Sequence, residues 1–231
     1  MLNIGIYGDS YVCYYDWLYT KRNIRKSWVD YVKDHHNVIS YSQSGSNLSY
    51  THDMVLAHHT SHDINIVLVT NYGRLHLPNL IRDNKYIPGI ISAESALANC
   101  TNDSNKKILS AAVDYYLHIE NEYEVTKFHY LMVDDIKSKV PNAIIVPCFP
   151  YSISCNRTKS MFDISMIDSN YYKIDRHVID IKRCHINDKN NNIFANKMLE
   201  HINHNLGNEF KVNLSDYVEP IGEPIEYNFT V

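Results

Sequence analysis

The chain has 231 residues, of which 45% are hydrophobic and 21% charged, and its formal net charge at pH 7 is −4. These values are typical of one globular domain that buries roughly 70–75% of its unfolded surface without a disulfide or structural metal. No run of Lys or Arg is long enough to follow a phosphate backbone, and no window is long enough to span a membrane. Nucleic acid and membrane are therefore not expected as partners.

The first part of the sequence alternates short apolar runs with stretches of helical periodicity. We predict strands over residues 2–7, 37–41 and 64–70, each rich in β-branched or aromatic residues and closed by small or polar ones. Helices are predicted between them, over residues 21–33 and 49–59.

A longer segment, residues 72–104, follows the third strand and contains Pro78, Pro88 and Gly89. It exceeds an ordinary connection, so we expect short helical pieces in it. Two interpretations of this insertion stay open. One is a lid or specificity loop, and the other is a surface elaboration without a role.

The second half begins with a long predicted helix from Ser104 to Lys139, ended by Pro141. A strand is expected over residues 143–149, and the polar turn His185–Asp188 starts the last helix. Residues 211–231 are expected to form an extended C-terminal arm that packs on its own domain or on a partner. No internal repeat or linker interrupts residues 1–231, so we predict a single domain.

Strands separated by helices predict an α/β three-layer sandwich with a mostly parallel, flavodoxin-like sheet. In such sheets ligands bind at the carboxyl ends of the strands. Those ends carry Gly8-Asp9-Ser10 after the first strand, Ser44-Gly45-Ser46-Asn47 after the second and Asn71 after the third, and His185 precedes the last helix. A serine, a base and two oxyanion donors are thus expected at one edge.

The block Ile6-Tyr7-Gly8-Asp9-Ser10 resembles the Gly-Asp-Ser motif that opens SGNH (GDSL) hydrolases, where it also follows the first strand. Gly45, Asn71 and His185 match the glycine, asparagine and histidine blocks of that family in the same order. The resemblance implies the SGNH fold and a serine esterase without cofactor or metal. The implied substrate is a small-molecule or carbohydrate ester, such as an O-acetyl or other acyl group on a carbohydrate or lipid.

Each of these positions has a chemical role in ester hydrolysis. A serine hydroxyl is a weak nucleophile at neutral pH, so Ser10 needs a general base, which His185 supplies. The backbone N–H groups of Ser10 and Gly45 and the side-chain amide of Asn71 would hold the oxyanion, and losing one such donor costs roughly 10²–10³ in rate. Asp9 is expected to hold the turn.

Two departures from the family pattern bear on activity. The third block reads Val69-Thr70-Asn71-Tyr72 rather than Gly-x-Asn-Asp, and Lys182 stands three residues before His185, where the family has an aspartate. Asp180, Asp188 or a backbone carbonyl is expected to orient the imidazole instead, the last giving a Ser–His dyad. Loss of an orienting acid costs on the order of 10⁴ in turnover.

Two alternative functions follow from these departures and from the first loop. A non-catalytic SGNH-like module that binds a glycan or a protein is favoured by the missing aspartate. A flavodoxin-like nucleotide binder is a weaker alternative, because Asp9 places a carboxylate where a phosphate would sit.

Other polar residues fit simpler roles. His58 and His62 share a helical face, but no second ligand cluster accompanies them, so we expect solvated histidines rather than a metal site. Arg74 is interpreted as the partner of a surface salt bridge or, alternatively, as the residue that holds an anionic substrate group. Cys184, next to His185, is expected to be a packed thiol.

Localisation is predicted from the cysteines and the N-terminus. The five cysteines are an odd number without a Cys-x-x-Cys pair, and the apolar N-terminal stretch is too short for a signal peptide and lacks a basic flank. We therefore expect a cytoplasmic protein. The bias toward Asn, Ile and Tyr, together with an SGNH-like domain, is typical of an AT-rich viral or phage genome. The sequence leaves the oligomeric state open.

Overall fold

The computed structural model of the protein describes residues 1–9, 12, 26–43, 45–69, 74–80, 86–87, 90–147, 188–207, 210, 212 and 216. Within them one parallel sheet has the strand order β2-β1-β3-β6, formed by β1 (Asn3–Gly8), β2 (Asn37–Ser42), β3 (Ile64–Val69) and β6 (Ile144–Pro147). This order matches the first four strands of the doubly wound order 2-1-3-4-5. The α/β class and the parallel sheet are confirmed.

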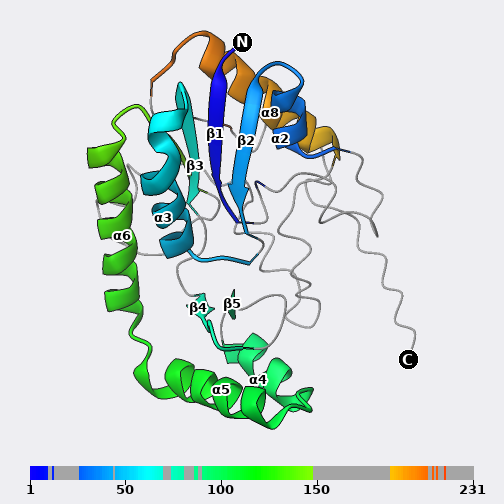
Figure 1. The fold of residues 1–231 in the computed structure, drawn as a ribbon, viewed down its shortest axis with the longest axis vertical. Helices are drawn as coiled ribbons and strands as arrows, with labels where there is room; N and C mark the ends of the chain where they lie inside the picture. Colours follow the sequence, from blue (N-terminus) through cyan, green and yellow to red (C-terminus); the bar gives the residue numbers. More distant parts are fainter. Residues whose placement is uncertain are drawn as a thin grey trace.

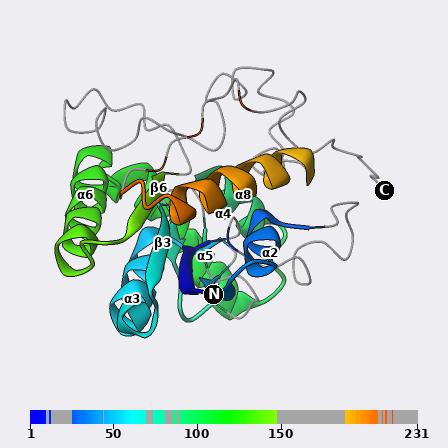
Figure 2. The same ribbon diagram turned by 90° about the horizontal axis from the view of Figure 1, so that it is seen from above.

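Helices cover both faces of the sheet (Figures 1 and 2): α2 (Trp28–Lys33) and α8 (Asp188–Asn203) on one face, α3 (Leu48–His58) and α6 (Glu122–Lys139) on the other. A short 3₁₀ turn, η2 (His59–Ser61), follows α3. Side chains alternate along each strand, so Ile66 and Leu68 of β3 enter one core while Val67 and Val69 enter the other. The result is a three-layer sandwich.

The core under α2 and α8 is built on aromatic packing. The Trp28 ring meets Phe194 edge to face with centroids 5.0 Å apart, and Phe194 meets Phe210 in the same way at 5.2 Å. Val212 is buried in this core, and Asp216 forms a 3.0 Å ion pair with Lys197 of α8. The described positions after α8 therefore contact their own domain.

A second, smaller group of elements, which we call the lobe, lies beyond the carboxyl edge of the sheet (Figure 1). It comprises the antiparallel pair β4 (Leu75–His76) and β5 (Tyr86–Ile87), the helices α4 (Ile90–Ala98) and α5 (Asp103–Asp114), and the π-helix η3 (Tyr115–Ile119). The lobe has its own buried residues, which are Leu80, Ile87, Ala93, Leu109 and Ala112. The lobe therefore extends beyond residue 104, which was the predicted end of the insertion.

The single helix predicted from Ser104 to Lys139 is wrong. α5 ends at Asp114, the π-helix η3 follows, and α6 begins at Glu122. The Asn121 side chain accepts a bond of 3.3 Å from the backbone N–H of Glu124, as a residue at a helix N-terminus does. This cap allows a second helix to start in a new direction, as Figure 1 shows.

The remaining predicted elements agree with the structure where it describes them. The three first strands, the helix after the second strand, the strand near residue 144 and the last helix are all present. The helix predicted over residues 21–33 is an exception, because Ser27 has an extended backbone and caps α2, so the helix begins only at Trp28; residues 21–25 lie outside the described part of the chain. Among the described helices, none is both long and apolar enough to cross a membrane.

Candidate functional site

The carboxyl ends of the strands face the lobe and form the edge where a ligand site is expected. The arrowheads of β1, β2 and β3 point toward the lobe in Figure 1. Strand β1 lies between β2 and β3, and the chain continues from β1 to β2 on one side of the sheet and from β3 to β6 on the other. This reversal of strand order is the position at which doubly wound sheets bind ligands. Gly8 and Asp9 stand at it, directly before Ser10 in the sequence.

Asp9 is fully buried and forms an ion pair with Arg74, with 2.6 Å between Asp9 Oδ2 and Arg74 Nη1. The same nitrogen donates a hydrogen bond of 2.8 Å to the carbonyl oxygen of Ser46. Arg74 therefore ties the end of β1 to the turn after β2 and to the segment after β3. Its side chain is 12% exposed, so the predicted surface salt bridge is in fact a buried one.

The turn after β2 has a left-handed glycine at its centre. Gly45 has φ of 74°, a conformation that costs a residue with a Cβ roughly 1–2 kcal/mol. Two residues later, Asn47 caps α3, because its Oδ1 accepts from the backbone N–H of Tyr50 at 3.2 Å. The Nδ2 of Asn47 donates to the carbonyl of Arg74 at 3.2 Å. The turn and the Arg74 backbone are therefore held together.

The chain on both sides of Ser10 is closely packed. A Cβ atom at Gly8 would come within 3.1 Å of the Leu68 Cβ, so a larger residue there would have to push β3 aside by a few tenths of an ångström. On the other side, Val12 is fully buried, and its N–H donates to the Asp9 carbonyl at 3.2 Å. The Ser40 hydroxyl donates to the Val12 carbonyl.

Most of the predicted catalytic residues fall outside the described part of the chain. This applies to Ser10, Asn71, His185 and Asp180. Asp188 is the first residue of α8, and its side chain is not described. Gly45 lies at the expected edge of the sheet. The roles assigned to all of these residues stay predictions.

His58, the last residue of α3, and His62 are half-buried, and each packs one side of its ring against aromatic side chains. Tyr41 stacks on His58 with ring centroids 4.4 Å apart and on Tyr7 at 4.9 Å. The Tyr41 hydroxyl lies 3.0 Å from His62 Nε2, and burial lowers the pKa of His62. Both histidines lie against the aromatic side chains of β1 and β2. Among the residues that the structure describes, no group of three His, Cys, Asp or Glu side chains could hold a metal ion.

Sequence reasoning identified this edge but missed how it is held together. Arg74 and Asp9 are 65 positions apart, and nothing in their local sequence indicates that they pair. The capping role of Asn47 could have been predicted, since an asparagine directly before a helical pattern is a typical N-cap. The arrangement places a buried ion pair and a glycine turn at the carboxyl edge of the sheet.

Comparison with known proteins does not assign a family. No protein-family model matches the chain, and no curated protein matches it in sequence.

Proposed function

We propose that this protein is a serine ester hydrolase of the SGNH type, with Ser10 as the nucleophile and His185 as the general base. The observation that carries the proposal is the buried Asp9–Arg74 ion pair at the carboxyl end of β1, directly before Ser10. A nucleophile at the strand-order reversal of a doubly wound sheet meets the binding site of such folds. The left-handed turn at Gly45 supports the same assignment.

The proposed reaction is acyl transfer to Ser10 followed by hydrolysis. His185 takes the proton as Ser10 Oγ attacks the ester carbonyl, and it returns that proton to the departing alkoxide. The N–H groups of Ser10 and Gly45 and the Asn71 amide hold the oxyanion. Water then attacks the acyl-enzyme by the same route, which releases the acid and restores the Ser10 hydroxyl.

The test is covalent labelling combined with kinetics on the purified protein. We expect a fluorophosphonate probe to add to the peptide that contains Ser10, and hydrolysis of p-nitrophenyl butyrate to fall by roughly 10³ or more in Ser10→Ala. Ser138→Ala, at an exposed position of α6, is the control and should keep both signals. Hydrolysis that survives in Ser10→Ala would refute Ser10 as the nucleophile.

The orienting group for His185 has its own test. If a carboxylate of this chain replaces the one missing at Lys182, then Asp180→Asn or Asp188→Asn should lower turnover. If a backbone carbonyl serves instead, Lys182→Asp should raise turnover, because it restores the acid of a triad. No change in any of the three variants would contradict this account of the site.

A non-catalytic binding module is the second candidate, and Lys182 in place of an aspartate favours it. For that function we expect a folded protein that the probe does not label and that hydrolyses no ester. A Ser10-containing peptide that carries the probe would exclude it.

A further inference from the structure

A cavity of about 300 Å³ lies where α3, α6 and η3 meet. Most of its wall is apolar, formed by Leu48 of α3, Val125, Phe128 and Met132 of α6, and the Tyr115 ring of η3. The cavity therefore lies between the sheet domain and the lobe, the kind of junction at which ligand pockets occur preferentially. Phe128 is 63% exposed although it lines the cavity, which puts this wall within reach of a ligand from solvent.

The cavity adjoins the edge of the sheet described above. Asn47 belongs both to its lining and to the hydrogen-bond network of that edge, since its Nδ2 donates to the Arg74 carbonyl. Arg74 in turn pairs with Asp9, and Gly45 stands two residues before Asn47. Asn47 therefore connects the lining of the cavity to the hydrogen-bond network that holds Asp9, the residue before Ser10 in the sequence.

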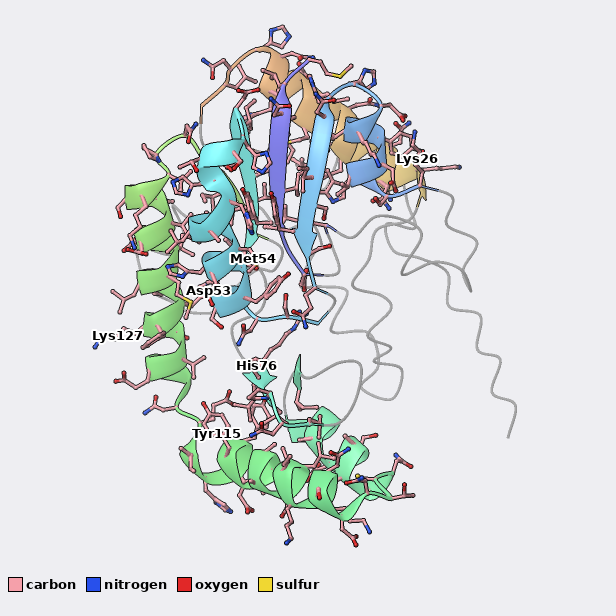
Figure 3. All side chains as sticks on the ribbon, viewed as in Figure 1. Lys26, Asp53, Met54, His76, Tyr115 and Lys127 are labelled. Atoms are coloured by element: carbon pink, nitrogen blue, oxygen red, sulfur yellow. The ribbon has the colours of Figure 1, made fainter. Side chains whose placement is uncertain are left out.

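The wall that the lobe contributes is anchored. The Tyr116 hydroxyl accepts from the backbone N–H of Leu75 at 3.0 Å and donates to the Ile87 carbonyl at 2.6 Å. These bonds tie η3 to both strands of the lobe, while the neighbouring Tyr115 lines the cavity. Figure 3 labels Tyr115 where the end of α5 approaches α6. A π-helical turn at this position agrees with the frequent occurrence of such turns at functional sites.

Charge limits what the cavity accepts. Among the described residues, no lysine or arginine lines it, and its only carboxylate is that of Glu124. His129 in the lining is buried, and burial lowers its pKa to about 4, so the ring is neutral at pH 7. An anionic ligand would meet the Glu124 charge without a cation to offset it. A neutral apolar group meets no such penalty.

We propose that this cavity binds the acyl group of the ester substrate, and that this group is a neutral medium-chain acyl of about ten non-hydrogen atoms. The number of atoms follows from dividing the cavity volume of about 300 Å³ by the roughly 30 Å³ that one water-sized group occupies. An acetyl group would leave most of the cavity empty. The inference rests on the proposed esterase function, but octanol binding tests the cavity independently of catalysis.

The first experiment measures binding of 1-octanol, a neutral probe of the required length, by isothermal titration calorimetry. We expect one octanol per chain in the wild type and in Ser10→Ala. Val125→Trp fills the cavity from α6 and should weaken binding about tenfold or more, since even one methylene in an apolar pocket changes affinity or rate by about tenfold. Leu131→Trp is the matched control, because Leu131 lies on the same helix, is 56% exposed and does not line the cavity.

The second experiment compares p-nitrophenyl octanoate with p-nitrophenyl acetate. We expect kcat/KM to favour octanoate in the wild type and in Leu131→Trp, and the octanoate-to-acetate ratio to fall about tenfold in Val125→Trp. Met132→Trp repeats both measurements from a second position if thermal unfolding shows that Val125→Trp is not folded.

The outcomes separate the two proposals. Ester hydrolysis without octanol binding, or with an unchanged ratio in the variants, would overturn the acyl pocket and leave the esterase standing. Octanol binding without any ester hydrolysis would overturn the esterase and with it the acyl role. Self-association of the chain that buries Phe128 and prevents octanol binding would also overturn the pocket.

Discussion

The buried ion pair between Asp9 and Arg74 offers the sharpest test of how the candidate site is held together. Asp9 is fully buried and the Arg74 side chain is 12% exposed, so a charge that loses its partner here stays largely out of water. Breaking a buried pair by removing one partner costs about 3–5 kcal/mol, whereas replacing both partners with apolar groups is often close to neutral. We therefore expect Asp9→Leu and Arg74→Met each to lower the free energy of unfolding by about 3–5 kcal/mol.

The assay is a double-mutant cycle by urea denaturation at pH 7. The double variant should lose no more than either single variant, which corresponds to a coupling energy of at least about 3 kcal/mol. The exposed pair Asp103–Lys106, separated by 3.6 Å on α5, is the control cycle. Its coupling should stay below about 1 kcal/mol, as is usual for surface pairs.

Additive losses at Asp9 and Arg74, or single losses as small as those of the control pair, would refute the reasoning. Such a result would mean that water screens the pair, and Arg74 would no longer explain how the end of β1 is fixed. A fluorophosphonate-labelling rate measured on the folded Arg74→Met variant then shows whether the pair also positions Ser10.

Two further predictions concern the walls of the cavity. Because burial lowers the pKa of His129 to about 4, the unfolded chain takes up a proton below pH 6.5 that the folded chain does not, so stability falls with pH between 6.5 and 4. At pH 4 the wild type should have lost about 3 kcal/mol more than His129→Leu, while the exposed control His204→Leu should lose as much as the wild type. An equal loss of unfolding free energy in all three proteins, measured by urea denaturation at each pH, would contradict this. Tyr116→Phe removes the two bonds to Leu75 and Ile87 and should cost about 1–3 kcal/mol, seen as faster amide hydrogen exchange at Leu75, and unchanged exchange there would show that the lobe does not depend on this anchor.

Elements with a strong local pattern could be predicted from the sequence alone. The β-branched run Ile64–Val69 and the helix from Asp188 were expected nearly where they lie, because burial imposes a period of two or 3.6 residues on the chain. The long helix over residues 104–139 was mistaken for the same reason. The π-helix η3, the non-helical Glu120 and the Asn121 cap separate α5 from α6, and of these only the asparagine is a local sequence signal.

The sequence by itself determined the parallel α/β class, the strand ends that form the candidate edge and the polar residues placed there. Only the tertiary structure decided that Arg74 is buried against Asp9, that His58 and His62 pack on Tyr41, and that α3, α6 and η3 enclose a cavity. The physical reason is that periodicity and capping act between residues a few positions apart. Ion pairing, ring stacking and cavity formation depend on which distant segments the fold brings together.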